Sequence, residues 1–192
     1  MIQYRKQKIP KGDRKMVYVL LADGFEEVEA IEPIDILTRG GVEVKTVGVT
    51  GKAITGAHGI CVIPDMQIKD VNIDDMELLM LPGGAGHELL DASNTVHALI
   101  NYAVANGIYI SAICAAPSIL GKKMLLKGKN ATCFPGYERY LYDAKIIPAK
   151  AVIDGKFITG KGAGAASEFG FLMLSVLKGN KIADKVKETM QY

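Results

Sequence analysis

The sequence predicts an α/β fold in which helices cover a mostly parallel sheet. Two strand-like segments, residues 16–21 and 42–49, enclose a helical pattern, and the turns that join these three elements are short. Two more apolar runs, residues 77–81 and 108–113, are each followed by small or glycine-rich residues. Strand, helix and strand joined in this way form a βαβ unit, whose strands pair in parallel.

The first unit begins with an apolar strand at residues 16–21 and a tight turn in which Gly24 suits a positive φ. Acidic residues in the next turn fit the N-terminus of a helix that runs to about Arg39. Because Pro33 has no N–H to donate, regular helix is expected to start near Glu32. The other elements expected in this half are the strand 42–49, a glycine-rich turn at 51–59 and a short strand at 60–63.

The second half continues the alternation. Residues 77–81 and 108–113 are short apolar runs bounded by turn residues, which is typical of buried strands. Asp154-Gly155 lies between two strand-like segments and is a strong hairpin signal. The other elements expected here are a helical turn at 87–91, a helix capped by Ser93 up to about 105, a short strand at 131–134, a helical segment at 137–142, hairpin strands at 149–153 and 156–159, and helices at 165–177 and 182–190.

Length and composition indicate a basic N-terminal extension, residues 1–15, and one domain, residues 16–192. The net charge of +2 gives no argument for nucleic acid as a partner. No apolar run approaches the roughly 18 residues of a membrane span, and no apolar region of a signal peptide follows the basic extension. The three cysteines show no Cys-x-x-Cys spacing, which favours reduced thiols and a cytoplasmic protein. The histidines lack ligand spacing with the cysteines, so no metal is expected.

Cys114 lies where the buried strand 108–113 turns into a helix that has Pro117 in its first turn. The N-terminus of a helix favours negative charge and can lower a cysteine pKa from about 8.5 to roughly 3.5–7.5. The position therefore predicts a reactive thiolate at a strand-to-helix nucleophile elbow. The alternative is a small buried core residue, as many free cysteines are.

Loops at the carboxyl ends of parallel strands converge on one edge of the sheet. Four such loops are conspicuous here, and they cover residues 24–29, 82–86, 114–116 and 160–164. Pro82-Gly83-Gly84 can present backbone N–H groups to an oxyanion, or it can be a tight turn that needs two glycines. Neither glycine-rich loop carries a nucleotide-binding fingerprint.

A Cys–His–acid triad is difficult to build, because all three histidines precede Cys114 and residue 115 is alanine. A carboxyl group is the alternative partner, and Glu26 and Glu29 follow the first strand directly. A carboxyl beside a thiolate is held protonated, so it can donate a hydrogen bond to sulfur and shuttle a proton.

Four motifs together resemble the DJ-1/ThiJ/PfpI superfamily, specifically its DJ-1-like branch, over about residues 16–187. They are Ala-Asp-Gly-Phe-Glu-Glu-Val-Glu-Ala at 22–30, Leu-Pro-Gly-Gly at 81–84, Ala-Ile-Cys-Ala-Ala-Pro at 112–117, and Thr-Gly-Lys-Gly-Ala-Gly with Glu168-Phe169 at 159–169.

The resemblance implies a flavodoxin-like three-layer sandwich and a homodimer without a cofactor. By the same resemblance, Cys114 is the reactive cysteine, Glu29 is its protonated partner, and the N–H groups of Gly84 and Ala115 bind an oxyanion. Gly83, Phe134 and Lys161 are pocket candidates.

This chain also departs from the family pattern. Phe134 stands where some DJ-1-like members have a histidine, so a mechanism that needs that histidine does not apply. Ala115 replaces the histidine of peptidase-like branches, which argues against peptidase or amidase activity. Ala163 replaces a frequent proline, which predicts a more mobile loop. Cys61 and Cys133 are expected to be packing residues.

Three functions are therefore open. The first is glutathione-independent glyoxalase or deglycase chemistry on α-oxoaldehydes such as methylglyoxal, with Cys114 as nucleophile and Glu29 as proton carrier. The second is a non-enzymatic oxidative-stress sensor or redox-regulated chaperone, in which Cys114 is oxidised to a sulfinate. The third is a Cys–His hydrolase or amidotransferase, which requires His58, His87 or His97 within hydrogen-bond reach of Cys114.

Overall fold

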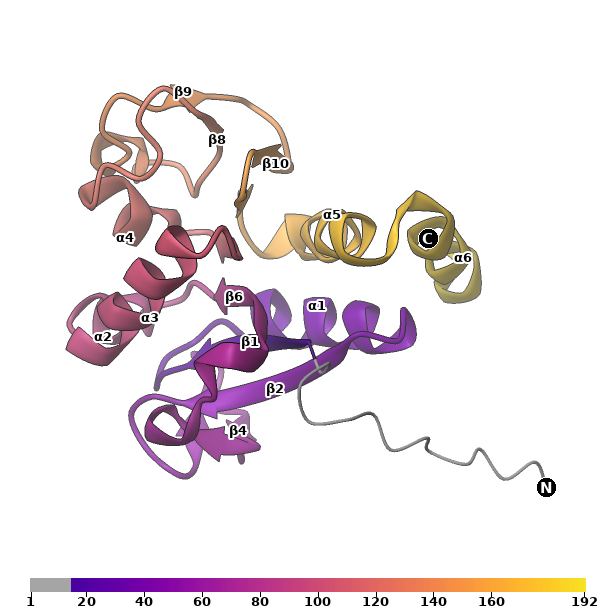
Figure 1. Ribbon diagram of the computed structural model, residues 1–192, viewed down its shortest axis with the longest axis horizontal. Coiled ribbons are helices and arrows are strands. Elements are labelled where there is room, and N and C mark those ends of the chain that lie inside the picture. The colour runs from indigo at the N-terminus through magenta and orange to yellow at the C-terminus, as the bar shows by residue number, and fades with distance from the viewer. Residues whose placement is uncertain (1–14) are drawn as a thin grey trace.

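A computed structural model describes residues 15–192, so almost all of the predicted basic extension lies outside the described residues. The described chain forms a central seven-stranded sheet with helices on both faces (Figure 1). This arrangement confirms the predicted α/β sandwich with a mostly parallel sheet.

The strand order in the sheet is β10-β11-β7-β6-β1-β2-β5. All neighbouring strands pair in parallel except β10 and β11, which form the antiparallel hairpin predicted from Asp154-Gly155. The strands are β1 (Met16–Leu21), β2 (Glu43–Gly48), β5 (Met66–Gln67), β6 (Met76–Leu81), β7 (Tyr109–Ile113), β10 (Ala151–Asp154) and β11 (Phe157–Gly160).

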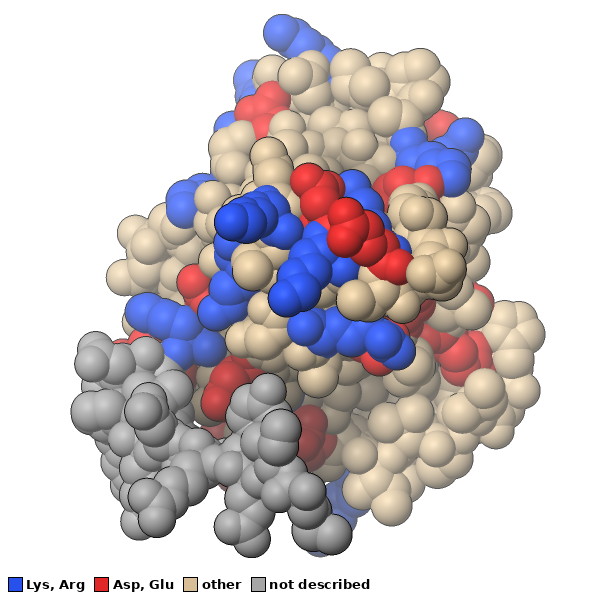
Figure 2. All heavy atoms as spheres, turned by 90° about the vertical axis from the view of Figure 1, so that its right-hand side faces the viewer, with Lys and Arg blue, Asp and Glu red and all other residues tan. Residues whose placement is uncertain are grey.

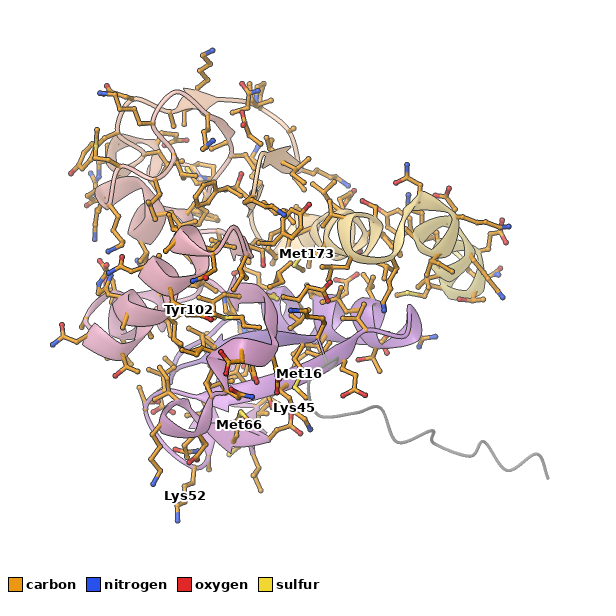
Figure 3. The ribbon with its side chains drawn as sticks, in the orientation of Figure 1. Met16, Lys45, Lys52, Met66, Tyr102 and Met173 are labelled. Atoms are coloured by element: carbon orange, nitrogen blue, oxygen red, sulfur yellow. The ribbon has the colours of Figure 1, made fainter. Side chains whose placement is uncertain are left out.

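Two apolar cores lie on opposite faces of the sheet, because successive side chains of a strand point to opposite sides. Tyr18 of β1 belongs to one core and Val19 to the other. Met173 packs in the core under α1, α5 and α6, whereas Tyr102 packs against the core under α2, α3 and α4 (Figure 3). The helices are α1 (Glu27–Arg39), α2 (His87–Asp91), α3 (Asn94–Ala105), α4 (Pro117–Lys122), α5 (Ala166–Lys178) and α6 (Asn180–Met190).

The first helix differs from its prediction. It begins at Glu27 instead of near Glu32, and it continues through Pro33. The carboxylate of Glu26 caps this helix by accepting the N–H of Glu29 at 2.7 Å. The cap and the packing of α1 on the sheet therefore override the proline signal.

Several small elements lie outside the main sheet. β3 (Ile54–Thr55) pairs with β4 (Cys61–Val62), although the sequence predicts only a turn at β3. The predicted strand at 131–134 is limited to β8 (Asn130–Ala131), which pairs with β9 (Lys145–Ile146). The 3-10 turns are η1 (Ile68–Asp70), η2 (Ile73–Asp75), η3 (Glu138–Tyr140) and η4 (Ala163–Ala165).

The face formed by the C-terminal helices carries basic and acidic side chains close together (Figure 2). On α6, for example, Lys187 lies 3.5 Å from Asp184 in an ion pair. Both signs of charge therefore share this surface. Among residues 15–192, no helix combines the length and the hydropathy that crossing a bilayer requires.

Candidate active site

The loops that follow β1, β6, β7 and β11 meet at one edge of the sheet, as the sequence predicts. Glu26 donates its N–H to the carbonyl of Gly83 at 3.2 Å, which joins the first loop to the second. Cys114 donates its N–H to the carbonyl of Gly160 at 2.9 Å, which joins the third loop to the fourth. These backbone bonds bring residues that are distant in sequence into one site.

Cys114 occupies the sharp turn between β7 and α4. Its φ of 65° lies in the left-handed region, which a residue with a side chain rarely adopts. The turn is fixed on both sides, because Cys114 donates to Gly160 and its carbonyl accepts the N–H of Phe134 at 2.8 Å. Strain held in this way by surrounding bonds is typical of functional positions. The residue as a whole is partly exposed.

The carboxyl group of Glu29 lies against the Cys114 thiol. Glu29 is in the first turn of α1 and is 1% exposed. One carboxyl oxygen, Oε2, accepts the N–H of Gly83 at 3.1 Å. The N–H of Ala163 and the Cys114 thiol also donate to this carboxyl. The structure therefore brings Cys114, Glu29 and Gly83 together.

Burial raises the pKa of Glu29, and the nearby charge of Glu26 raises it further. Hydrogen bonds from Cys114, Gly83 and Ala163 act in the opposite direction, and the resulting pKa is about 7. A carboxyl with this pKa is close to equally protonated and ionised at neutral pH. It is thus suited to accept and return a proton there.

Cys114 does not lie in the first turn of a helix, the position from which the sequence predicts a lowered pKa. The helix α4 has only six residues and begins three positions after the cysteine, at Pro117. Burial raises the pKa of the thiol, and the negative charge of Glu29 raises it further, to about 12. Removal of the thiol proton therefore depends on Glu29, and the two groups titrate as a coupled pair.

Two backbone donors oppose this effect. The N–H groups of Gly84 and Ala115 form hydrogen bonds to the sulfur and lower the pKa of the thiol. Gly84 has a φ of 76°, a conformation that glycine adopts without steric cost. The two amides named as oxyanion donors in the sequence therefore lie beside the predicted nucleophile.

The remaining pocket candidates lie at the rim of this site. Phe134 is 47% exposed, and its ring lies close to Gly162. Lys161 is exposed and donates its N–H to the carbonyl of Lys150 at 2.9 Å. Both residues line a cavity that adjoins Glu29 through Gly162.

The other two cysteines differ from each other. Cys133 is buried in the core, as expected for a packing residue. Cys61 is exposed at β4, so the expectation that it packs in the interior is wrong.

Each histidine has a partner other than Cys114. His87 Nδ1 lies 2.8 Å from the carbonyl oxygen of Gly84, and His97 Nε2 lies 2.7 Å from that of Asp91. His58 Nδ1 lies 2.7 Å from Glu27. No hydrogen bond among residues 15–192 joins a histidine to Cys114, so the geometry gives no support to a Cys–His hydrolase.

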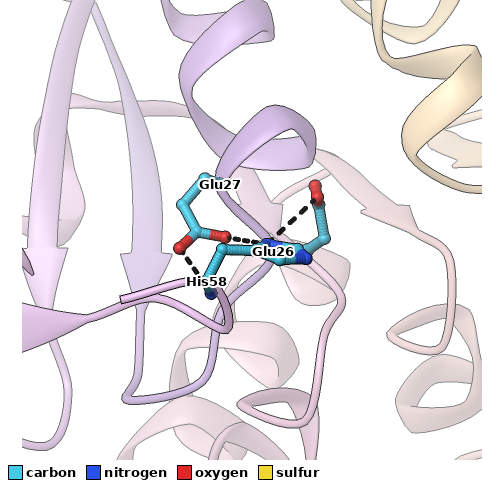
Figure 4. A group of neighbouring side chains, drawn as sticks. All are labelled: Glu26, Glu27 and His58. Atoms are coloured by element: carbon cyan, nitrogen blue, oxygen red, sulfur yellow. Dashed lines mark hydrogen bonds and ion pairs between the residues drawn. The ribbon is translucent and has the colours of Figure 1, made fainter. Parts of the chain in front are cut away.

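Glu27 ties the loop between β3 and β4 to the start of α1. Its carboxylate accepts hydrogen bonds from the side chain of His58 and from the backbone N–H of His58, the latter at 2.8 Å (Figure 4). It also accepts the backbone N–H of Ile60 at 3.4 Å. Burial raises the pKa of Glu27, but these hydrogen bonds outweigh it and lower the pKa to about 2. Glu26, Glu27 and His58 form a cluster of possible metal ligands, yet Glu27 already has three donors. The cluster is thus a loop anchor.

We expect His58→Ala to lower the melting temperature in a pH-dependent way. The hydrogen bond to Glu27 raises the pKa of His58. The contribution of His58 to stability is therefore complete below the ordinary histidine pKa of 6.5, and it is lost as pH rises through the raised pKa. The pKa of Glu27 is lowered, so the contribution of Glu27 to stability is complete above pH 4.5 and is lost as pH falls toward about 2. Thermal unfolding should therefore show the largest difference from wild type between pH 4.5 and 6.5. A difference in melting temperature between wild type and His58→Ala that did not change with pH would contradict the stabilising pairing of His58 with Glu27.

Some residues at the site were not singled out for these roles from the sequence. They are Ala163, which donates to Glu29, Gly160, which holds Cys114, and Lys150 and Pro135, which line the adjoining cavity. Backbone donors and acceptors carry no residue-type signal, so the sequence offered none for Ala163 or Gly160. The glycine-rich motif at 159–164 indicated only the loop.

Comparison with known proteins gives consistent results. The sequence is 34% identical to Drosophila melanogaster protein dj-1beta over 178 residues, which is 91% of this chain and 94% of that protein. The crystal structure of Drosophila DJ-1beta superposes with a TM-score of 0.88 at 31% identity, covering 93% of this chain and 98% of that one.

Two further relatives carry names of enzymes. A glutathione-independent glyoxalase of Caenorhabditis elegans is 30% identical to this chain, and the alignment covers 88% of this chain and 91% of the glyoxalase. A deglycase of Pyrococcus abyssi is 31% identical to this chain, and the alignment covers 77% of this chain and 90% of the deglycase. The family description "DJ-1/PfpI family" matches residues 15–176. With this match, the shared fold and the relatives above, the chain belongs to the DJ-1/PfpI family.

Proposed function

We propose that the protein converts α-oxoaldehydes such as methylglyoxal to 2-hydroxy acids, without glutathione and without a cofactor. The observation that carries this proposal is the contact between the thiol of Cys114, a partly exposed residue, and the buried carboxyl of Glu29, whose pKa is about 7. Relatives named as glyoxalase and deglycase support the reaction class.

In the first step, the ionised carboxylate of Glu29 accepts the thiol proton while the sulfur of Cys114 bonds to the aldehyde carbon. The C=O electron pair moves to the oxygen, and the N–H groups of Gly84 and Ala115 stabilise that charge, because they already lie at the sulfur. Glu29 then returns its proton to this oxygen. The product is a hemithioacetal, and Glu29 is ionised again.

In the second step, Glu29 removes the hydrogen of the hemithioacetal carbon as a proton and returns it to the neighbouring carbonyl carbon. The proton of the hemithioacetal hydroxyl passes to the oxygen of that carbonyl, so that the first carbon becomes a thioester carbonyl and the second carries the hydroxyl. The first carbon is oxidised and the second is reduced by the same two electrons, so no external oxidant is needed. Water then cleaves the resulting thioester, which releases the 2-hydroxy acid and restores the Cys114 thiol. Methylglyoxal would give lactate.

Lactate formation from methylglyoxal tests this proposal directly. We expect the wild-type protein to form lactate in the absence of glutathione and Cys114→Ala to form none, because the nucleophile is missing. Cys61→Ala is the matched control, since Cys61 is exposed and takes no part in the site; it should retain the full rate. A Cys114→Ala protein that keeps its rate would contradict the mechanism.

A redox sensor uses the same residues, because the donors at the sulfur could also hold the oxygens of a sulfinate. The lactate measurement separates the two functions. A folded wild-type protein that forms no lactate, but whose Cys114 alone is oxidised by mild peroxide, would favour the sensor over the enzyme.

We also propose a homodimer, as the resemblance to the family implies. The apolar side chains of Val28 and Ile31 on α1 and of Ile60 and Ile63 beside β4 are between 42% and 81% exposed. Glu27 ties these two segments together through His58. A second copy of the chain would cover such a surface.

A further inference from the structure

A cavity of about 490 Å³ lies beside the Glu29 carboxyl, on the side of the η4 loop. A Cβ built on Gly162 would lie 3.3 Å from the Phe134 ring and 3.8 Å from Glu29 Oε1, so the cavity and the carboxyl approach each other at this residue, which carries no side chain. The backbone of Ala163 donates to the same carboxyl. The cavity is lined by Phe134, Pro135, Lys150, Lys161, Gly162, Ala163, Gly164 and Ala165.

The size of this cavity exceeds what a three-carbon substrate requires. Sites for small molecules usually measure about 300–1,000 Å³. The cavity falls in that range even though Cys114 itself does not line it. It therefore offers room for the part of a substrate that does not react.

The lining is apolar except for two lysines. Phe134, Pro135 and the alanines supply the apolar wall. Lys150 is paired with Glu168, so its charge is compensated. Lys161 takes part in none of the ion pairs found within residues 15–192, and its exposed side chain leaves an uncompensated positive charge at the rim. Long lysine side chains pack their stems on apolar surface and keep the ammonium group in water.

We propose that this cavity selects α-oxoaldehydes whose second substituent is apolar and ends in an anionic group, with Lys161 as the specificity-determining residue. The apolar body would lie against Phe134, and the anion would lie near the Lys161 ammonium at the rim. The reacting carbons would remain at Cys114 and Glu29. This inference rests on the proposed function, because it assigns a substrate class to the same site.

A matched pair of substrates tests the selection. We expect kcat/KM for 4-carboxyphenylglyoxal to exceed that for phenylglyoxal by about three- to fivefold in wild type, which is the scale of one exposed ion pair. In Lys161→Met this ratio should fall to about one, and in Lys161→Arg it should be kept. Raising the ionic strength from about 0.01 M to about 1 M shortens the Debye length from about 30 Å to about 3 Å and so screens the attraction between Lys161 and the substrate anion. The ratio of the two kcat/KM values should therefore also fall in wild type.

Lys52→Met is the control for a general loss of positive charge. Lys52 is exposed and follows β2, toward the opposite edge of the sheet from β10 and β11 (Figure 3). The Lys52 variant should keep the wild-type ratio. A wild-type ratio of one, or an anion preference that survives in Lys161→Met, would overturn the proposal.

A binding measurement keeps the test valid even if no α-oxoaldehyde is turned over. Benzoate and its neutral counterpart benzamide should both slow the alkylation of Cys114 by iodoacetamide when they occupy the cavity. In wild type, we expect benzoate to protect Cys114 from alkylation at a concentration about three- to fivefold lower than benzamide needs. In Lys161→Met, the two compounds should protect Cys114 at equal concentrations. Equal protection in wild type would overturn the proposed selection. If the protein turned over no α-oxoaldehyde but benzoate still protected Cys114 better than benzamide, only the proposed enzymatic function would be overturned.

Discussion

Glu29→Gln is expected to reduce kcat/KM for methylglyoxal by a factor of about 100 to 10,000, the usual contribution of a general acid–base group. Glutamine fills the same space and can still accept the N–H of Gly83, which lies 3.1 Å from Oε2 in the wild type. It can neither accept the thiol proton of Cys114 nor carry a proton between the two substrate carbons. The loss should therefore appear mainly in kcat, and steady-state lactate formation would measure it.

Glu32→Gln is the control for this substitution. Glu32 is on the same helix and bonds the hydroxyl of Ser167, away from the thiol. The Glu32 variant should keep the wild-type rate, which would show that an acid-to-amide change on α1 is not harmful in itself. If Glu29→Gln also kept that rate, the proposed role of Glu29 would be wrong.

Gly83→Ala is expected to abolish most of the activity for a steric reason. A Cβ at this position would overlap the carboxyl of Glu29 and the Cβ of Cys114, and it would lie 3.0 Å from the carbonyl oxygen of Ile113. Neither neighbour can move easily, because Glu29 is buried and Cys114 is held by its backbone bonds. Overpacking of this kind costs about 1–3 kcal/mol of stability, and it would separate the thiol from its base.

Gly51→Ala provides the comparison. A Cβ on Gly51 would meet only the carbonyl oxygen of Ala53, at an ordinary 3.5 Å, and Gly51 has no positive φ. Both variants should be measured for lactate formation and for thermal unfolding. Gly83→Ala should lose activity even at temperatures where it is folded, whereas Gly51→Ala should match the wild type. Full activity in Gly83→Ala would show that the contact between Glu29 and Cys114 tolerates displacement.

The main elements of the fold could be predicted from the sequence because their signals are local. Apolar runs bounded by turn residues placed β1, β6 and β7, and Asp154-Gly155 placed the hairpin of β10 and β11. The start of α1 could not be predicted, because the Glu26 cap and the packing of the helix override the effect of Pro33. The two-residue strands β3 and β5 have too few residues to show a period.

The members of the site could be predicted, but their electrostatics could not. The elbow at Cys114 and its nearness to the loop of Glu26 and Glu29 follow from the order of strands and loops, whereas the choice of Glu29 came from the resemblance to the family. The pKa of the thiol depends on burial, on the length of α4 and on the charge of Glu29, which only the three-dimensional arrangement supplies. The backbone donor Ala163 was likewise found only in the structure.

The rate of Cys114 alkylation by iodoacetamide across pH, measured by mass spectrometry at each cysteine, tests the coupling of Cys114 to Glu29 most directly. The exposed Cys61 serves as an internal reference in the same sample. We expect a midpoint near pH 7 in wild type, because Glu29 ionises there and can take the thiol proton as the sulfur reacts. In Glu29→Gln this midpoint near pH 7 should disappear, because no base is left at the thiol, and the rate should follow the thiolate alone, whose pKa burial still raises. A midpoint near the ordinary cysteine value of about 8.5 in both proteins would contradict the coupling and, with it, the proposed mechanism.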